Sequence, residues 1–345
     1  MIVLAIESTC DETGAAVAKG YGEPMAIEIL SDVKATSTKM HAKYGGIVPE
    51  IAAREQMISI IPVIETAIEN SGTRIEDIDS IAVTQGPGLI GSLLIGVETA
   101  KALALAWKKP LIKVNHMAAH VFANWIRPLV TPELPAIALI VSGGHTDLIY
   151  LEGLTVWKWI GGTRDDAAGE AFDKAARVMG FPYPGGPQIE VLSKKAKGES
   201  KFKLPRPMIH EDNLEMSFSG LKTALVQVVG SPAFAEATAR SSREQVICAL
   251  AREFNQAVVD VLIKKTMKAV ELYQPKSVLL AGGVAANALL RENLVASIKY
   301  LGKKLFIPEL KYCTDNAAMI AACALMRPDY VDSLKLRPNS GLEVG

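Results

Sequence analysis

The sequence has no excess charge of either sign, because 37 Lys and Arg side chains are balanced by 37 Asp and Glu side chains. A chain of zero net charge has no global field to hold a polyanion. A nucleic-acid partner would therefore need a local basic patch or a basic partner protein. Cysteine is also scarce, and the four cysteines show no CxxC spacing. This excludes a disulfide-rich secreted fold and fits a reducing compartment with buried, inert thiols.

Long apolar runs are missing as well. The apolar residues Ile2–Ile6 are followed directly by Glu7, so we interpret them as a first strand and not as part of a signal peptide. We expect no apolar run close to the ~18–20 residues that a membrane span needs. At 345 residues, the chain exceeds what one hydrophobic core usually supports. The sequence thus predicts a cytoplasmic protein of two domains with no membrane segment.

Two stretches of the chain share a strand–turn–strand pattern. Residues 2–18 place a turn dense in carboxylates and hydroxyls between two apolar runs, and residues 136–151 do the same around the sequence SGGHT. We interpret this as a weak internal repeat, in topology more than in sequence. Two such hairpins facing one another, each from its own domain, would suit the phosphates of a nucleotide, since glycine turns offer successive backbone N–H groups to anions.

Two further strand-to-helix turns are rich in glycine. Residues 85–92 follow a strand at 78–84 and are neither a Walker A loop nor a GxGxxG motif, so anion binding and tight packing both stay open. Residues 282–287 follow a strand at 277–281, and there we expect the small residues to let a flat base approach while Asn287 hydrogen-bonds it.

Two segments have the composition of interaction surfaces. Residues 49–70 predict a helix whose apolar stripe includes Ile58, Ile61 and Ile64. Such a stripe normally packs in the core, although on the outer side of a domain it could dock a partner. Six positive charges lie within residues 194–206, which is the best candidate of the chain for contact with a phosphate backbone, although such clusters are usually solvated faces.

The histidines offer the clearest chemical signal. His116 and His120 are four residues apart in Asn115-His-Met-Ala-Ala-His, so on a helix both imidazoles lie on one face, within reach of one metal ion. For an arbitrary pair at this spacing, contacts with water or backbone are the commoner explanation. The pair alone therefore leaves a metal site and a structural role open.

Ten motifs, taken together and in order, resemble the bacterial branch of the tRNA threonylcarbamoyl-adenosine transferase (TsaD) family, which was once described as O-sialoglycoprotein endopeptidases. The matching stretches are IESTCDETG (6–14), YGGIVPEIAAR (44–54), TQGPGLIGSL (84–93), NHMAAH (115–120), VSGGHT (141–146), DDAAGEAFDK (165–174), YPGGP (183–187), FSGLKTA (218–224), AGGVAAN (281–287) and CTDNAAM (313–319).

The resemblance implies the duplicated α/β fold of actin, hexokinase and the sugar kinases, with a nucleotide cleft between two domains. We expect domain I to span 1–115 plus 313–333, with a partner-docking helix at 49–70. Domain II would span 116–312, with a basic insertion at 191–216. Pro128, Pro132 and Pro135 are a second candidate for the linker.

The resemblance also implies the site residues. His116, His120 and Asp315 would bind one divalent metal ion, with Fe²⁺ favoured and Zn²⁺ possible by ligand type; the alternative for Asp315 is a helix N-cap. Threonylcarbamoyl-adenylate would be the substrate, and ATP or AMP could occupy the same site. The residues expected to line it are Ile140, Val141, Ser142, Gly143, Gly144, Asp173, Gly186, Glu190 and Asn287. The archaeal and eukaryotic branch has a metal-binding tyrosine where this chain has Ile140, so water or a substrate oxygen should complete the coordination.

The expected reaction transfers the threonylcarbamoyl group to N6 of the adenosine next to the anticodon, in tRNAs that read codons beginning with adenine, and releases AMP. Asp11 or Glu12 is our candidate to accept the proton of the incoming amine. The expected partners are tRNA, a TsaB-like heterodimer partner, a TsaE-like ATPase and, as the source of the adenylate, a TsaC-like synthase.

Three rival functions deserve comparison. A small-molecule kinase or ATPase of the same superfold would hold Mg²⁺ through carboxylates and has no use for a histidine pair. A metalloprotease is more remote, because zincins place a glutamate where this chain has Met117. A non-catalytic nucleotide-binding scaffold would not need three metal ligands.

Overall fold

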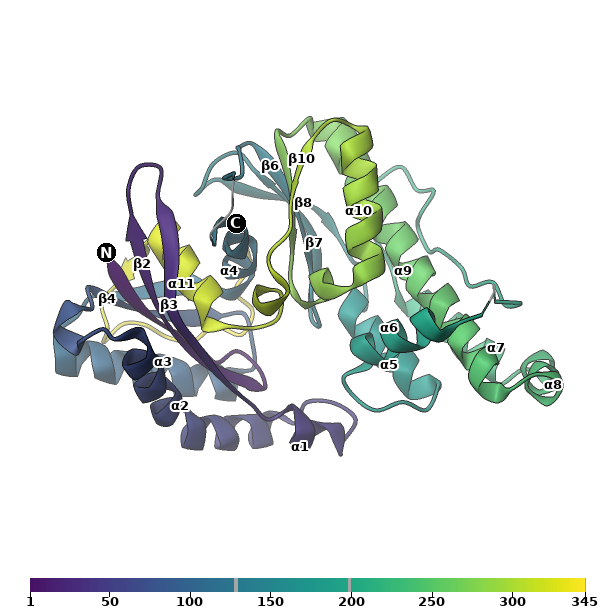
Figure 1. The fold of residues 1–345 in the computed structure, drawn as a ribbon, viewed down its shortest axis with the longest axis horizontal. Coiled ribbons are helices and arrows are strands. Elements are labelled where there is room, and N and C mark those ends of the chain that lie inside the picture. Colours follow the sequence, from purple (N-terminus) through teal and green to yellow (C-terminus); the bar gives the residue numbers. More distant parts are fainter. Residues whose placement is uncertain (127–129, 198–199, 345) are drawn as a thin grey trace. The chain divides into compact units, whose positions relative to one another are not determined.

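The computed structural model describes residues 1–126, 130–197 and 200–344, so Pro128 lies outside the described residues. The chain divides into two compact units (Figure 1). The first unit comprises Met1–Pro132, Glu152–Trp157 and Pro308–Gly345. The second comprises Glu133–Leu151 and Lys158–Ile307.

The first unit is built on a six-stranded sheet in the order β11-β5-β4-β1-β2-β3. Its strands are β1 (Ile2–Glu7), β2 (Glu12–Tyr21), β3 (Ala26–Thr36), β4 (Ser80–Gly86), β5 (Leu111–Asn115) and β11 (Tyr330–Val331). Its helices are α1 (Thr38–Ala42), α2 (Pro49–Ser71), α3 (Ile90–Trp107), α4 (His116–Phe122) and α11 (Ala317–Met326), with short 3₁₀ turns η1 (Ile75–Asp77), η2 (Ala123–Trp125) and η4 (Leu310–Tyr312).

The second unit is built on a five-stranded sheet in the order β10-β9-β6-β7-β8. Its strands are β6 (Ala136–Val141), β7 (Thr146–Leu151), β8 (Trp157–Gly162), β9 (Ser277–Ala281) and β10 (Lys304–Phe306). Its helices are α5 (Ala168–Val178), α6 (Gly185–Lys195), α7 (Ser219–Val229), α8 (Pro232–Arg240), α9 (Arg243–Tyr273) and α10 (Ala288–Tyr300), with the 3₁₀ turn η3 (Gly283–Ala286).

The two sheets repeat one topology. In the first, the central strand β1 pairs antiparallel with β2 and parallel with β4, and β4 pairs parallel with β5. In the second, β6 pairs antiparallel with β7 and parallel with β9, and β9 pairs parallel with β10. The order 3-2-1-4-5 therefore occurs twice, which confirms the predicted internal repeat.

The structure moves the predicted domain boundary. His116–Pro132 belong to the first unit and not to domain II. The reason is local packing: α4 lies against α11, and the Phe122 ring packs in a tilted arrangement against Trp157 of the first unit, with centroids 5.6 Å apart. The division after Pro132 agrees with the alternative linker at the prolines.

One helix, α3, is long and apolar enough to cross a membrane by length and composition, contrary to the expectation that no run approaches that length. Its inner side packs in the core of the first unit through Val97, Ala100 and Ala104. Its other side is exposed at Ile90, Leu94 and Leu105.

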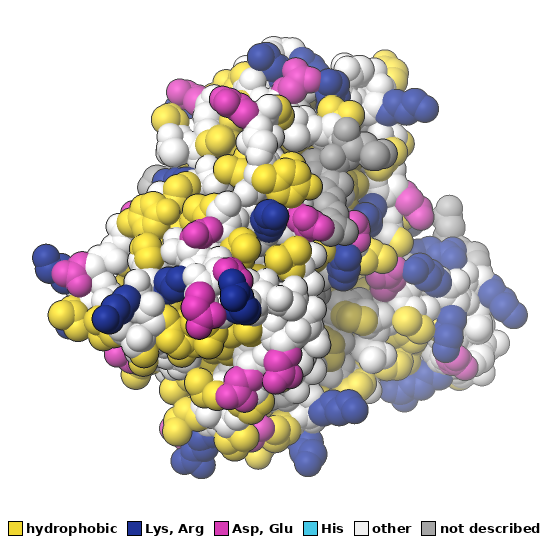
Figure 2. All heavy atoms as spheres, turned by 60° about the vertical axis from the view of Figure 1, so that its left-hand side comes forward, with side chains coloured by type: hydrophobic (Ala, Val, Ile, Leu, Met, Phe, Trp, Pro, Cys, Tyr) yellow, Lys and Arg dark blue, Asp and Glu magenta, His cyan; other side chains and the backbone are white. Residues whose placement is uncertain are grey.

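Helix α2 buries only part of its predicted apolar stripe. Ile60, Val63 and Ile64 are buried, whereas Ile58 and Ile61 are 71% and 45% exposed. Since the sheet and α3 already cover the inner side, these isoleucines face solvent. Figure 2 shows hydrophobic side chains on the side of the first unit turned to the viewer. The predicted stripe is therefore buried at Ile64 but wrong at Ile58 and Ile61, and an apolar outer surface remains.

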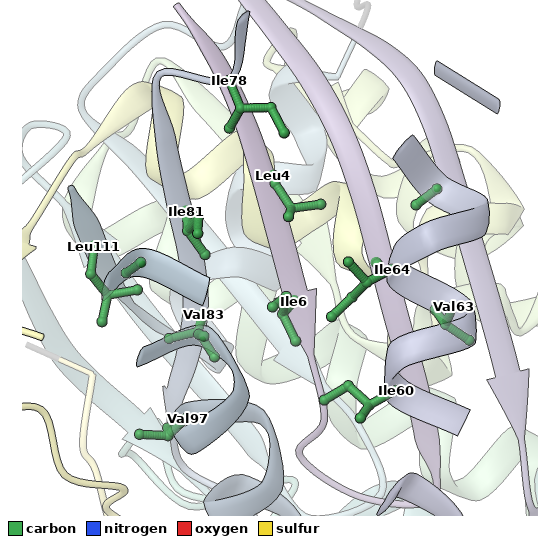
Figure 3. Packing of buried hydrophobic residues seen from close by; sticks show 14 of the residues in the cluster. Leu4, Ile6, Ile60, Val63, Ile64, Ile78, Ile81, Val83, Val97 and Leu111 are labelled. Atoms are coloured by element: carbon green, nitrogen blue, oxygen red, sulfur yellow. The ribbon is translucent and has the colours of Figure 1, made fainter. Parts of the chain in front are cut away.

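Strand β1 explains how the core and the polar site come to share one strand. Leu4 and Ile6 point into the cluster formed with α2 and α3 (Figure 3). Side chains alternate between the faces of a strand, so Val3, Ala5 and Glu7 point to the other face, which α11 covers. Glu7 is buried there, at the end of the strand.

The structure decides between the two roles left open for the glycine-rich turn at residues 85–92. The N–H of Gly88 donates to the carbonyl of Ser340, the N–H of Leu89 donates to that of Thr9, and a Cβ on Gly86 would overlap the carbonyl of Asn339. The C-terminal segment and the first hairpin thus occupy this turn, which favours packing over anion binding. The sequence PGGP, at residues 184–187, begins α6 at Gly185.

The close approach of α3 to the first hairpin can be tested at two glycines of that helix. A Cβ on Gly96 would lie 2.1 Å from Oγ of Ser8, whereas a Cβ on Gly91 would meet only Ala53 at 3.4 Å. We expect Gly96→Ala to lower the free energy of unfolding by about 1–3 kcal/mol through overpacking. The matched control Gly91→Ala should leave it unchanged or raise it by ~0.5–1 kcal/mol through helix propensity. Equal denaturation midpoints for the two variants would contradict this packing.

Candidate metal and nucleotide site

Helix α4 positions both histidines. Asn115 caps its first turn by accepting a hydrogen bond from the N–H of Ala118 at 3.0 Å, so His116 is the first helical residue and His120 lies one turn later. Both imidazoles are buried and their rings meet edge to face, with centroids 4.7 Å apart. The predicted helical stacking of the pair is confirmed.

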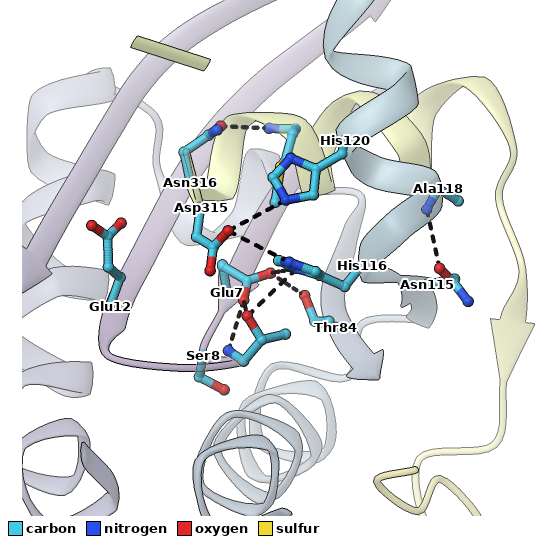
Figure 4. Close-up of polar contacts among 12 residues, drawn as sticks. Glu7, Ser8, Glu12, Thr84, Asn115, His116, Ala118, His120, Asp315 and Asn316 are labelled. Carbon is cyan, nitrogen blue, oxygen red and sulfur yellow. Dashed lines mark hydrogen bonds and ion pairs between the residues drawn. The ribbon is translucent and has the colours of Figure 1, made fainter. Parts of the chain in front are cut away.

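Asp315 reaches the same point from the loop before α11 (Figure 4). Its Oδ1 lies 3.5 Å from Nε2 of His116 and 3.3 Å from Nε2 of His120. The alternative role as a helix cap falls to the next residue, because Asn316 accepts a hydrogen bond from the N–H of Met319. The Asp315 carboxylate is therefore left to face the histidines.

The pKa values of the two histidines are shifted in opposite directions. Burial opposes charge on His116, but Glu7 and Asp315 outweigh it and raise the pKa of His116 to about 10. For His120 burial dominates and lowers the pKa. Burial also opposes ionisation of Asp315, yet the two histidines hold the pKa of its carboxyl well below its usual value. Near neutral pH the site without metal thus holds one imidazolium, one neutral imidazole and one carboxylate.

These residues fit a divalent metal ion. Their candidate ligand atoms lie within 4.8 Å of one another. Nδ1 of His120 is buried and has no hydrogen-bond partner among the described residues, and its Nε2 points at Asp315. Two imidazoles and one carboxylate leave coordination positions open for other oxygens, as catalytic sites require.

Charged groups of β3 and of the first hairpin lie on the Asp315 side of the triad. Lys34 on β3 pairs with Glu12 at 2.7 Å and donates at 3.4 Å to the Asp315 carbonyl. Burial raises the pKa of Glu12 to about 7 in spite of Lys34. Asp11 accepts a hydrogen bond from the hydroxyl of Thr38. Both candidate proton acceptors thus lie in the unit that holds the triad.

Sequence reasoning did not predict Glu7 or Lys34 as part of this environment. Glu7 lies 3.2 Å from Nδ1 of His116, at the end of β1. The strand period was the available signal, since it places Glu7 on the face of the sheet opposite Leu4 and Ile6. Lys34 offered no comparable signal.

In the second unit, the predicted substrate residues gather around α5. The N–H of Gly169, in its first turn, donates to the carbonyl of Ser142. Asp173 accepts a hydrogen bond from the N–H of Gly185 at the start of α6. Gly143 and Gly144 are exposed, and a Cβ on either, or on Gly186, would meet no atom within 4 Å. These backbones are therefore open to a ligand.

Other predicted residues already have partners or are inaccessible. Ile140 and Val141 are fully buried within β6, so neither side chain is open to a ligand. The Asn287 side chain caps α10 at Leu290 and donates to Asn255. Glu190 pairs with Lys194 at 2.6 Å. The structure thus brings the predicted residues to one region of the second unit, but assigns several side chains to internal contacts.

Comparison with solved structures defines the class of fold. HypF from T. kodakarensis matches with a TM-score of 0.59 and 14% identity, over 94% of this chain and 47% of that one. Component A of the (R)-2-hydroxyglutaryl-CoA dehydratase from Acidaminococcus fermentans matches with a TM-score of 0.51 and 15% identity, over 95% and 97%. The predicted duplicated actin- and hexokinase-like fold is therefore confirmed.

Comparison of the sequence with known proteins then identifies the family within this class of fold. The family model described as "TsaD: tRNA N6-adenosine threonylcarbamoyltransferase" matches residues 28–322. Relatives bearing that enzyme name are 47% identical in Bacillus subtilis, over 93% of this chain and 89% of the relative, and 46% identical in Symbiobacterium thermophilum, over 100% and 97%. The chain belongs to the TsaD family.

The raised pKa of His116 makes a prediction for metal binding. A ligating imidazole must lose its Nε2 proton, so protons compete with the ion up to a pH near 10. We expect the affinity of the protein for Zn²⁺, measured with a competing chelator, to rise about tenfold per pH unit between pH 7 and 9. An affinity that levels off above the ordinary histidine pKa would contradict this. Thermal melts of the metal-free protein at each pH provide the control for folding.

Proposed function

We propose that this protein transfers the threonylcarbamoyl group of threonylcarbamoyl-adenylate to N6 of the adenosine next to the anticodon, in tRNAs that read codons beginning with adenine. The observation that carries the proposal is the convergence of His116, His120 and Asp315 in a chain of the TsaD family. The reaction forms a bond between N6 and the carbamoyl carbon and breaks the bond from that carbon to the phosphate oxygen of AMP.

His116, His120 and Asp315 would hold one divalent ion, Fe²⁺ by family resemblance or Zn²⁺ by ligand type. When bound, the ion supplies Lewis acidity toward the phosphate and carbonyl oxygens of the mixed anhydride. The two histidines are buried and the Asp315 side chain is 26% exposed, which limits competing water at the imidazoles and strengthens charge interactions there.

The second unit would bind the nucleotide part of the adenylate, and ATP or AMP at the same place. Support comes from the open backbones of Gly143, Gly144 and Gly186, since exposed N–H groups can receive phosphate or ribose oxygens. Asp173 would act mainly by fixing the start of α6, because its carboxylate already accepts the Gly185 N–H.

Glu12 is our candidate to accept the proton that N6 loses. A general base is most effective when its pKa is close to the working pH, and that of Glu12 is about 7. Asp11 would position the hairpin through its hydrogen bond with Thr38.

The tRNA needs a local basic surface, and the segment 194–206 is the candidate. Within it, Lys194 pairs with Glu190, and Arg206 pairs with Glu253 and Asp260. Lys195, Lys197 and Lys201 would contact the phosphate backbone, with help from partner proteins.

The exposed side of α2 would dock a TsaB-like partner. Met57, Ile58 and Ile61 are all exposed there. A TsaE-like ATPase and a TsaC-like source of adenylate complete the proposed system, which would act in the cytoplasm.

The rival functions lack comparable support. A kinase of this superfold would hold Mg²⁺ with carboxylates and would leave two buried histidines without a role. For a zincin-type protease, the position of the general base is occupied by Met117, which is buried and apolar.

The direct test incubates the protein and its TsaB-like partner with threonylcarbamoyl-adenylate and unmodified tRNA and follows the modified nucleoside by mass spectrometry. We expect His120→Ala and Asp315→Asn to lose bound metal and to reduce transfer by at least ~100-fold. Asp77→Asn, an exposed carboxylate of the same unit, is the matched control and should transfer normally. Full transfer by a metal-free triad variant would refute the proposal.

The proton acceptor has its own test in the pH profile of single-turnover transfer. With Glu12 as the base, the rate should rise as its carboxyl ionises and level off above a pH of about 7. Glu12→Gln should abolish this rise and slow transfer by ~10²–10⁴-fold while the adenylate still binds. Asp11→Ala should also slow transfer but keep the rise near pH 7. If the rise persists in Glu12→Gln and disappears in Asp11→Ala, the assignment is reversed.

A further inference from the structure

Glu7 is a buried carboxylate beside the metal ligand His116. Its side chain is 1% exposed, at the end of a strand whose other residues are aliphatic or alanine. Such burial is costly unless the carboxylate receives hydrogen bonds. Glu7 receives them on both oxygens, so the position is specified by the surrounding chain.

Both Glu7 oxygens are fully used. Oε1 accepts from the backbone N–H of Thr9 at 2.7 Å and from the Thr9 hydroxyl. Oε2 accepts from the Thr84 hydroxyl at 2.6 Å and lies 3.2 Å from Nδ1 of His116. A carboxylate has about four acceptor positions, and here four donors from three segments of the chain face it. This leaves no lone pair to ligate an ion directly.

The contact with His116 is directional. Nδ1 of that ring faces Glu7, whereas Nε2 faces Asp315 (Figure 4). A carboxylate that accepts from Nδ1–H keeps the proton on that nitrogen and leaves the Nε2 lone pair for a metal. His120 has no such partner among the described residues, because its Nδ1 is buried and unpaired.

We propose that Glu7 is a positioning residue of the metal site, held in turn by Thr84 and Thr9, and that it fixes the tautomer and orientation of His116. The inference rests on the proposed function only in its choice of metal ligands. It identifies the contribution of β1 and β4 to the site: Glu7 and Thr84 are at the ends of neighbouring parallel strands, and together they hold the first ligand of α4.

The test measures metal affinity without substrate, so it is independent of transfer activity. Glu7→Gln preserves the shape but can present an amide N–H to Nδ1. We expect it to weaken Zn²⁺ binding by about 10- to 100-fold. Glu98→Gln, an exposed glutamate of the same unit, is the matched control and should bind as the unchanged protein does. Thermal melts of the metal-free variants report whether folding is intact.

A spectroscopic readout separates positioning from a purely structural role. In metal-loaded protein labelled with ¹⁵N-histidine, His116 should show Nδ1–H and a ligated Nε2, with its signals assigned by loss in His116→Gln. In Glu7→Gln this pattern should weaken or invert. Unchanged affinity and unchanged ¹⁵N shifts in a folded Glu7→Gln protein would overturn the proposal.

If Glu7→Gln fails to fold, a second pair of variants at Thr84 tests whether Glu7 positions His116 for metal binding. Thr84→Val removes one donor to Glu7 and leaves the carboxylate in place, so Zn²⁺ affinity should fall by a few-fold. Thr84→Ser keeps the hydroxyl and should restore it. Equal affinities for Thr84→Val and Thr84→Ser would contradict the proposed role. If Glu7→Gln weakens Zn²⁺ binding as expected but the unchanged protein shows no transfer, the proposed function fails and this inference stands.

Discussion

Packing of α11 against α4 and the central strand β1 is the constraint on which the rest of this structure depends. Helix α11 is composed almost wholly of small and aliphatic residues, and nine of its ten residues are buried. Alanines allow it to lie close to β1 and β2 and to α4 at once. The loop that enters α11 carries Asp315, so the packing of an apolar helix determines where a carboxylate meets two histidines.

In the triad, a desolvation penalty is offset by attraction between opposite charges. Removing the imidazoles and Asp315 from water disfavours their charged forms, and the opposite charges of His116, Glu7 and Asp315 offset that penalty. A divalent ion would replace the acidic Nε2 proton of His116 and use Nε2 of His120, which faces Asp315 and has no hydrogen-bond partner among the described residues. The same low-dielectric surroundings raise the pKa of Glu12 to about 7, so one region can supply both charge stabilisation and a base.

Much of the fold could be predicted from the sequence, because strands and helices carry a clear hydrophobic period and the two halves share an order of elements. The spacing of His116 and His120 placed both on one helical face. Asp315 could be joined to them only through family resemblance, because no local pattern connects residues so far apart in the chain. Glu7 was missed because a carboxylate after an apolar run is more often a turn residue.

The second unit shows where resemblance reaches its limit. It brought Ile140, Val141 and Asn287 into the predicted substrate set, yet the first two are buried in β6 and the third caps α10. A motif match cannot distinguish a side chain that touches a ligand from one that shapes the backbone around it. Glycine and proline usually mark turns, but in the PGGP sequence Gly185 packs against Asp173 and starts α6.

The central claim is that His116, His120 and Asp315 hold a metal ion. Its most direct test is X-ray diffraction from crystals of the metal-loaded protein, with data collected on both sides of the absorption edge of the metal. The account predicts one anomalous peak bonded to Nε2 of His116, Nε2 of His120 and the Asp315 carboxylate, with Glu7 outside bonding distance. A peak ligated by Glu7, or a metal ion bound only elsewhere on the chain, would contradict it.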